Sequence, residues 1–174
     1  MGPIFLTFYS ARMMTRNRSG HPSVSKRGKF ANNGEFADII MSLRKSALKH
    51  RSNAAPGKRR FGLHRYLTQV YRIYIDLLSK RISKSATCQI ADLAGIRVRK
   101  SAHPIRLLID ASIGPEDPKQ KSRWVAALRY VHGWRLPPRK VRWCFSQHGG
   151  VYGCARKYAA LNKAARHRRQ SRWS

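Results

Sequence analysis

Apolar residues recur every three or four positions along most of the chain after residue 35, which is the spacing of one face of an α-helix. No segment alternates apolar and polar residues in the manner of a β-strand. We therefore expect an all-α fold with a compact multi-helix body. The pattern predicts helices over residues 35–50, 61–83, 87–94, 104–113, 118–131 and 139–147, and from 151 onward.

Helix boundaries are marked by capping residues, prolines and glycines. Asn33 and Asp117 can accept hydrogen bonds from the first amides of the helices that follow them. Pro104 suits the first position of a helix, where a missing N–H group costs nothing. Residues 52–57 have the composition of a linker, and residues 148–150 should end the preceding helix before the last helix begins.

Composition divides the chain into three regions. Residues 1–34 contain no acid and are rich in serine, glycine, asparagine and basic residues, which predicts a flexible basic arm. Residues 35–113 form a helical region. Residues 114–174 form a strongly basic helical region with a basic tail, in which no acid follows Asp117. The composition of the arm is also that of a mitochondrial transit peptide, so a mitochondrial location is the alternative to a cytoplasmic, nucleoid-associated one.

The charge balance points to a polyanionic partner. The 174 residues include 37 Lys and Arg against 7 Asp and Glu, for a formal net charge of +30. Nucleic acid is the commonest polyanion in a cell, and basic side chains release its condensed counterions. A membrane surface usually attracts one short basic segment, whereas here the charge is spread along the whole chain. Hydrophobic residues make up 42% of the chain, enough to build a core.

Several other classes of protein are disfavoured. Three cysteines without close pairing indicate reduced, intracellular thiols, and no apolar run approaches the roughly 18 residues that span a bilayer. Cys144, His148 and Cys154 lie close in sequence, but their spacing matches no familiar zinc site. We expect no metal and no cofactor.

Catalytic patterns are also weak. Asp110, Glu116 and Asp117 could contribute to the magnesium site of a nuclease. Asp117 is better explained as a helix cap, and Asp76 and Asp110 should pair with nearby arginines. No nucleophile elbow and no phosphate-binding glycine loop occurs in the chain. We therefore expect a binding protein rather than an enzyme.

Residues 89–100 (QIADLAGIRVRK) resemble the first helix and turn of helix-turn-helix DNA-binding proteins. Ala91 takes the small position inside the first helix, Gly95 the turn, and Ile96 the position that locks the second helix. The resemblance places a helix-turn-helix near residues 87–103, although Pro104 would interrupt its second helix early.

Residues 149–169 (GGVYGCARKYAALNKAARHRR) resemble the C-terminal motif of Fis-like regulators, with Ala155 in the small position. The resemblance implies a helix-turn-helix near residues 150–169, whose second helix would carry Asn162, Lys163, Arg166, His167 and Arg169. Asparagine and arginine are the side chains that read adenine and guanine edges. Ala159 stands where that family usually has glycine, so one continuous helix is the alternative. For both segments, an ordinary helix pair with a solvated basic face is the simpler interpretation.

Further contacts come from basic clusters and aromatic residues. A helix that starts after Asp117 would present Lys119, Lys121 and Arg123 at its positive end, either as a phosphate clamp or as a solvated face. Aromatic residues among the basic ones can stack on bases, although core packing is the expected role of Trp124 and Tyr158. The predicted nucleic-acid-binding residues are Lys58, Arg59, Arg60, Arg97, Arg99, Lys100, Lys119, Lys121, Arg123, Asn162, Lys163, Arg166, His167, Arg168 and Arg169.

The leading hypothesis is a small DNA-binding regulator, or an accessory factor of the kind found on mobile elements. A palindromic target would require a homodimer. RNA is the alternative ligand, in a structural subunit of a ribosomal or RNA-guided ribonucleoprotein. A third hypothesis is a protein that inhibits or remodels a nucleic-acid enzyme, which would make that enzyme a protein partner.

Overall fold

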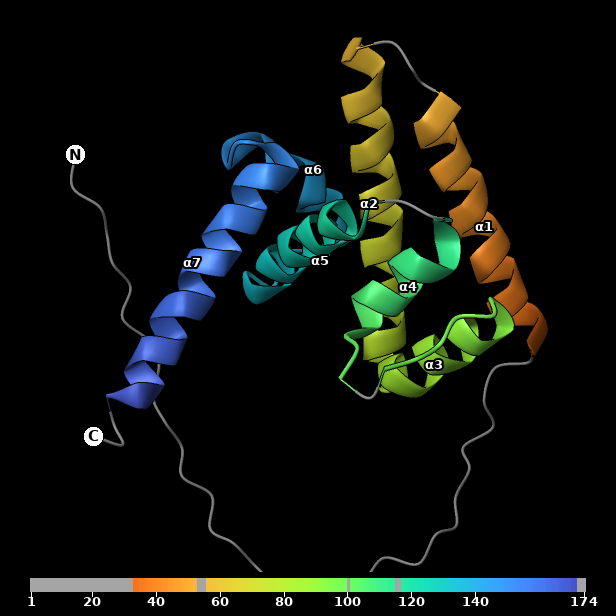
Figure 1. The fold of residues 1–174 in the computed structure, drawn as a ribbon. Coiled ribbons are helices and arrows are strands. Elements are labelled where there is room, and N and C mark those ends of the chain that lie inside the picture. Colours follow the sequence, from red (N-terminus) through yellow and green to blue (C-terminus); the bar gives the residue numbers. More distant parts are fainter. Residues whose placement is uncertain (1–32, 53–55, 100, 115–116, 172–174) are drawn as a thin grey trace, which may run out of the picture.

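The computed structural model describes residues 33–52, 56–99, 101–114 and 117–171, apart from the side chains of 33, 51, 52 and 56–61. This part of the chain contains seven α-helices, a short 3-10 helix and no strand, which confirms the all-α prediction (Figure 1). The flexible arm predicted for 1–34 lies almost wholly outside the described residues. The elements are α1 (Asn33–Ser52), α2 (Pro56–Ser79), α3 (Ser83–Leu93), α4 (Pro104–Ser112), α5 (Pro118–Gly133), η1 (Pro138–Lys140), α6 (Val141–Gln147) and α7 (Gly150–Gln170).

Helix α2 is the centre of the packing. It contacts α1, α3, α4, α5, η1 and α6. Its buried Tyr66, Val70 and Tyr74 repeat at helical spacing, and the largest fully buried side chain, Trp124 of α5, packs edge-on against Tyr66. Both helical regions predicted from composition contribute to this one core cluster. The expected core role of Trp124 is confirmed, and Tyr158 of α7 packs against the cluster while partly buried.

Three helix boundaries differ from the prediction by four or five residues: the start and the end of α2, and the start of α3, which was predicted at residue 87. Helix α2 begins at Pro56, inside the segment predicted as a linker, because proline lacks the N–H group that a first helical residue leaves unused. Its predicted end at Ser83 is wrong. The chain turns after Ser79 through Arg81, which has a left-handed φ of +58°, and α3 begins at Ser83.

Other predicted starts are confirmed. Pro104 is the first residue of α4, which is capped by His103, whose Nδ1 accepts a hydrogen bond from the Ile105 amide at 3.2 Å. The Asp117 carboxylate accepts a hydrogen bond from the Lys119 amide at 2.9 Å and caps α5. These caps fix where two helices enter the core.

The junction between α6 and α7 depends on glycine. Gly149 and Gly150 have φ of +74° and +78°, a left-handed conformation that residues with a Cβ atom rarely adopt. A Cβ atom on Gly153 would lie 1.7 Å from the His148 carbonyl oxygen, so only glycine lets α7 start so close to the end of α6. From this junction α7 packs along α5, as Figure 1 shows.

Candidate nucleic-acid interface

Helix α7 consists of an anchored inner half and an exposed outer half. Val151, Cys154 and Ala155 are buried in the core, and the Arg129 guanidinium lies 4.9 Å from the centroid of the Tyr158 ring. Every residue from 159 to 170 is exposed. At 1.5 Å per residue this outer half is about 18 Å long. It continues without a break from the inner half, which is held by the core (Figure 1).

Basic residues of α7 line up on the side away from the core. Arg156, Lys163 and His167 are seven and four residues apart, so their side chains follow one face of the helix. Arg166 flanks the same row, and the small Ala160 fills the gap between Arg156 and Lys163. We call the four polar members the α7 stripe: Arg156, Lys163, Arg166 and His167.

The remaining predicted residues of α7 point elsewhere. Asn162 and Arg169 continue the helical face that carries the buried Val151 and the half-buried Tyr158, so they belong to the side that packs on α5. Arg168 lies on a third face. The structure therefore separates a set of side chains that the sequence grouped on one recognition helix.

The helix-turn-helix predicted for 150–169 is wrong, because Gly150–Gln170 is one continuous helix. Ala159 and Ala160, at the position of the expected turn, are among the strongest helix formers. The chain does turn between two helices in this region, but one helix earlier, at His148 and Gly149.

The helix-turn-helix predicted for 87–103 is also wrong. Helix α3 ends at Leu93, and Gly95 makes the expected turn with a φ of +72°. No helix follows until α4 begins at Pro104. Arg97 and Arg99 are exposed on the connection, and Lys100 lies outside the described residues. In Figure 1, α3 lies at the opposite side of the molecule from α7.

The start of α5 contributes a smaller surface than predicted. Lys119 and Arg123 are exposed, and the Arg123 guanidinium lies 5.2 Å from the centroid of the Tyr152 ring on α7. This contact brings a basic residue of α5 next to the first turn of α7. Lys58, Arg59 and Arg60 lie in the first turns of α2, but their side chains are outside the described residues.

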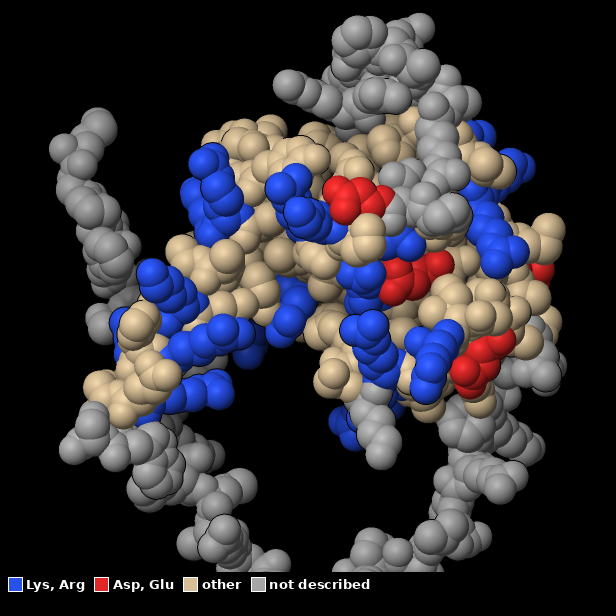
Figure 2. Space-filling view, in the orientation of Figure 1, with Lys and Arg blue, Asp and Glu red and all other residues tan. Residues whose placement is uncertain are grey.

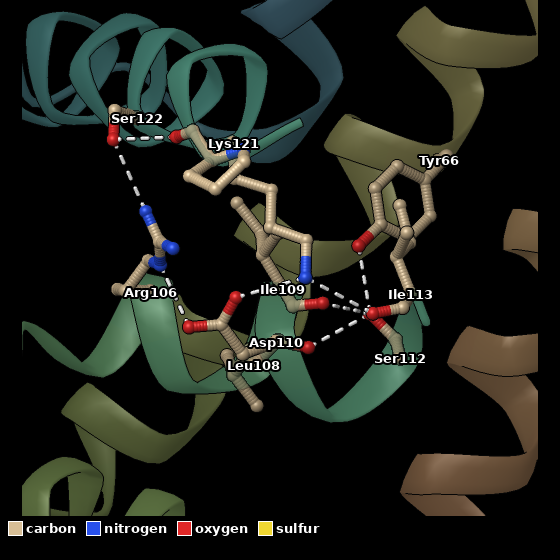
Figure 3. A network of polar contacts seen from close by, with 10 residues as sticks. Tyr66, Arg106, Leu108, Ile109, Asp110, Ser112, Ile113, Lys121 and Ser122 are labelled. Carbon is tan, nitrogen blue, oxygen red and sulfur yellow. Dashed lines mark hydrogen bonds and ion pairs between the residues drawn. The ribbon is translucent and has the colours of Figure 1, made fainter. Parts of the chain in front are cut away.

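Lys121 does not belong to this surface, contrary to the prediction. Its side chain is only 10% exposed, and Nζ lies 3.1 Å from Asp110 Oδ1 while donating a hydrogen bond to the Ile113 carbonyl at 3.2 Å (Figure 3). Arg106 Nε donates to the other Asp110 oxygen at 2.7 Å, which confirms the expected arginine partner of Asp110. A buried ammonium that is paired in this way is not accessible to phosphate.

Acidic and basic side chains are segregated along the molecule. The acids of the described residues lie on α1 to α4 and at the cap of α5, and none lies on α6 or α7. Asp76 pairs with Lys80 at 3.2 Å rather than with the expected arginine, and Glu35 lies 3.6 Å from the same ammonium. In Figure 2 no acidic side chain lies over α7, whereas lysines and arginines do.

The cysteine and histidine cluster has the chemistry of packing residues. Cys144 and Cys154 are fully buried, and burial raises the pKa of both thiols, that of Cys154 to about 12. Burial and the neighbouring Lys157 lower the pKa of His148, whose Nδ1 lies 2.8 Å from Lys157 Nζ. Protonated thiols are poor metal ligands. Within the described ranges, no three His, Cys, Asp or Glu side chains gather where they could hold a metal ion.

Comparison of the chain with protein-family models, curated proteins and solved structures found no match. None of the described helices combines the length and the apolar character needed to cross a bilayer. The function is therefore inferred from the geometry and charge of α5 and α7.

Proposed function

We propose that the protein binds duplex nucleic acid, with DNA favoured, by placing the outer half of α7 in the major groove. The observation that carries this proposal is the α7 stripe, a row of exposed basic residues on a helix that projects beyond the core. No acid lies on that helix. The proposed function is binding rather than catalysis.

The dimensions of α7 support this mode of binding. The major groove of B-form DNA is about 12 Å wide and admits one α-helix. Ala159 and Ala160 leave the start of the exposed outer half narrow, so the backbone can approach the groove closely there. Lys163 and Arg166 can then reach phosphates or base edges. The major groove of A-form RNA is deep and narrow, so a helix fits it less well.

Helix α5 supports the same placement from one side. Lys119 and Arg123 are exposed near its start, and the contact of Arg123 with Tyr152 brings that start next to α7. These residues would contact the phosphates that flank the groove. Phosphate contacts fix the orientation of a protein on the duplex, whereas base contacts supply its specificity.

The test compares two charge-matched double variants of the nuclease-treated full chain. Lys163→Ala with Arg166→Ala removes two charges from the α7 stripe, and Arg168→Ala with Arg169→Ala removes two charges from other faces of the same helix. Binding to a labelled 20-base-pair DNA is measured by fluorescence anisotropy between 50 and 200 mM salt. Each lost phosphate contact should reduce the slope of log affinity against log salt by about 0.9.

The stripe variant should therefore lose about two units of slope and at least tenfold in affinity, while the control variant changes both less. Equal effects of the two variants would contradict insertion of the stripe into the groove. A wild-type protein that ignores DNA at 50 mM salt would refute the proposed function. A clear preference for duplex RNA of the same sequence would transfer the proposal to a ribonucleoprotein.

A further inference from the structure

We propose that the cavity beside Tyr152 binds one unpaired base, so that the preferred target is a duplex continued by a single strand. This inference rests on the proposed function and specifies its ligand. The Tyr152 side chain is 49% exposed and lies outside the core cluster. A role in packing therefore does not account for a large aromatic residue at this position.

The cavity has the size and lining of a site for a planar aromatic group. Its volume is about 550 Å³, within the usual range for small-ligand sites. Tyr152 and the partly buried His64 are the accessible aromatic residues of its lining, and the ring of the fully buried Phe145 lies 5.2 Å from that of His64. No acid is among the residues that line the cavity: Leu63, His64, Phe145, Ser146, Gly149, Gly150, Val151 and Tyr152.

Arg123 prepares the Tyr152 ring for stacking. Its guanidinium lies 5.2 Å from the centroid of that ring, which restrains the ring through a cation–π contact. Arg123 is exposed, so the same charge is available beside the ring for the phosphate of a stacked nucleotide. An aromatic ring beside an arginine is the combination with which proteins hold single strands without strict sequence preference.

The position of the cavity connects it to the proposed duplex site. Tyr152 precedes Arg156 by four residues, so it continues the row of the α7 stripe toward the core. Lys163 lies eleven residues further along, about 16 Å at 1.5 Å per residue. This distance corresponds to about five base pairs at 3.4 Å each. A strand leaving a duplex bound at Lys163 can therefore reach Tyr152.

The experiment compares a blunt 20-base-pair DNA with the same duplex carrying a four-nucleotide single-stranded extension. The first unpaired base is replaced by 2-aminopurine, whose fluorescence falls when it stacks on an aromatic ring. We expect the wild-type full chain to prefer the extended DNA by about tenfold, the order measured for one base stacked on an aromatic side chain. We also expect it to quench the probe.

Variants assign the effect to the ring. Tyr152→Ala should reduce the preference to about one and abolish quenching, whereas Tyr152→Phe should keep both. Trp134→Ala removes another exposed aromatic residue and should leave the preference unchanged. Circular dichroism confirms that each variant is folded. A preference that survives Tyr152→Ala would overturn the inference.

Failure of this inference is distinguishable from failure of the proposed function. Equal binding of blunt and extended DNA, together with sensitivity to Lys163→Ala and Arg166→Ala, would refute only the base site. Absence of binding to either DNA would refute both proposals. Saturable binding of free deoxyadenosine monophosphate without a preference for extended DNA would assign the cavity to a mononucleotide and would also overturn the inference.

Discussion

Replacing Lys121 by methionine tests the most direct disagreement between sequence and structure. Methionine has a similar length, but it leaves Asp110 Oδ1 without the ammonium at 3.1 Å and the Ile113 carbonyl without its donor at 3.2 Å. Removing one partner of a buried ion pair typically lowers the free energy of unfolding by about 3–5 kcal/mol. Arg106 still neutralises Asp110, so we expect the lower end, about 3 kcal/mol.

Urea unfolding at neutral pH, followed by circular dichroism of the helices, measures this change. In a chain of this size, about 3 kcal/mol corresponds to a fall of roughly 6–12 °C in Tm. Lys119→Met is the matched control, because Lys119 is exposed two residues away and its loss should change stability by less than about 0.5 kcal/mol.

DNA binding should rank the two variants in the opposite order from stability. Lys119→Met should reduce the salt slope of DNA binding by about one unit, while folded Lys121→Met should keep the wild-type slope. The reasoning is refuted if Lys121→Met unfolds at the wild-type urea concentration and lowers the salt slope as much as Lys119→Met does. Lys121 would then be a surface residue, as the sequence suggested.

Three further predictions concern stability. Burial, followed by the charges of Arg129 and His132, lowers the pKa of His103 to about 4, whereas an unfolded histidine titrates near 6.5. The unfolded chain therefore binds the extra proton first. The contribution of His103 to the free energy of unfolding is fully present above pH 6.5 and is lost as the pH falls toward 4. The loss should be about 1–2 kcal/mol, because the ring is partly exposed. In urea titrations, His103→Asn should flatten this pH dependence. Gly153→Ala should lower the free energy of unfolding by about 1–3 kcal/mol, because its Cβ atom would meet the His148 carbonyl. Gly133→Ala meets open space and should lower it by less than about 1 kcal/mol. Similar unfolding midpoints of the two variants would contradict this prediction. Arg81→Gly should raise the free energy of unfolding by up to about 1 kcal/mol by relieving its positive φ, and a loss of stability would show that the side chain matters more.

Local signals in the sequence were sufficient for most of the fold. Helical periodicity and the absence of alternation predicted the all-α class, and Pro104 and Asp117 marked two helix starts correctly. The errors concern features that depend on tertiary packing. Nothing near Arg81 in the sequence indicates a left-handed residue, and the end of α2 there is set by where α3 must turn back on α1 and α4.

The site was predicted in composition but not in arrangement. The sequence located the basic C-terminal region, but Ala159 in place of glycine was the only sign that α7 continues without a turn. Lys121 matched its neighbours in chemistry and was therefore placed on the surface, although it stands three residues before Trp124 and seven before Leu128, on the buried face of α5. Tyr152 could have been separated from the core aromatics, because at 3.6 residues per turn it lies roughly 100–120° around the helix from Val151 and Tyr158.

Within the described residues, the absence of acids from α6 and α7 separates positive from negative charge, which adds an electric dipole to the net charge. The field of a polyanion exerts a torque on this dipole, which turns α7 toward the polyanion before any contact forms. A larger share of diffusional encounters then begins with the projecting helix facing the ligand. Moving one acidic residue onto α7 should accordingly slow association more than it speeds dissociation, and added salt should reduce that difference.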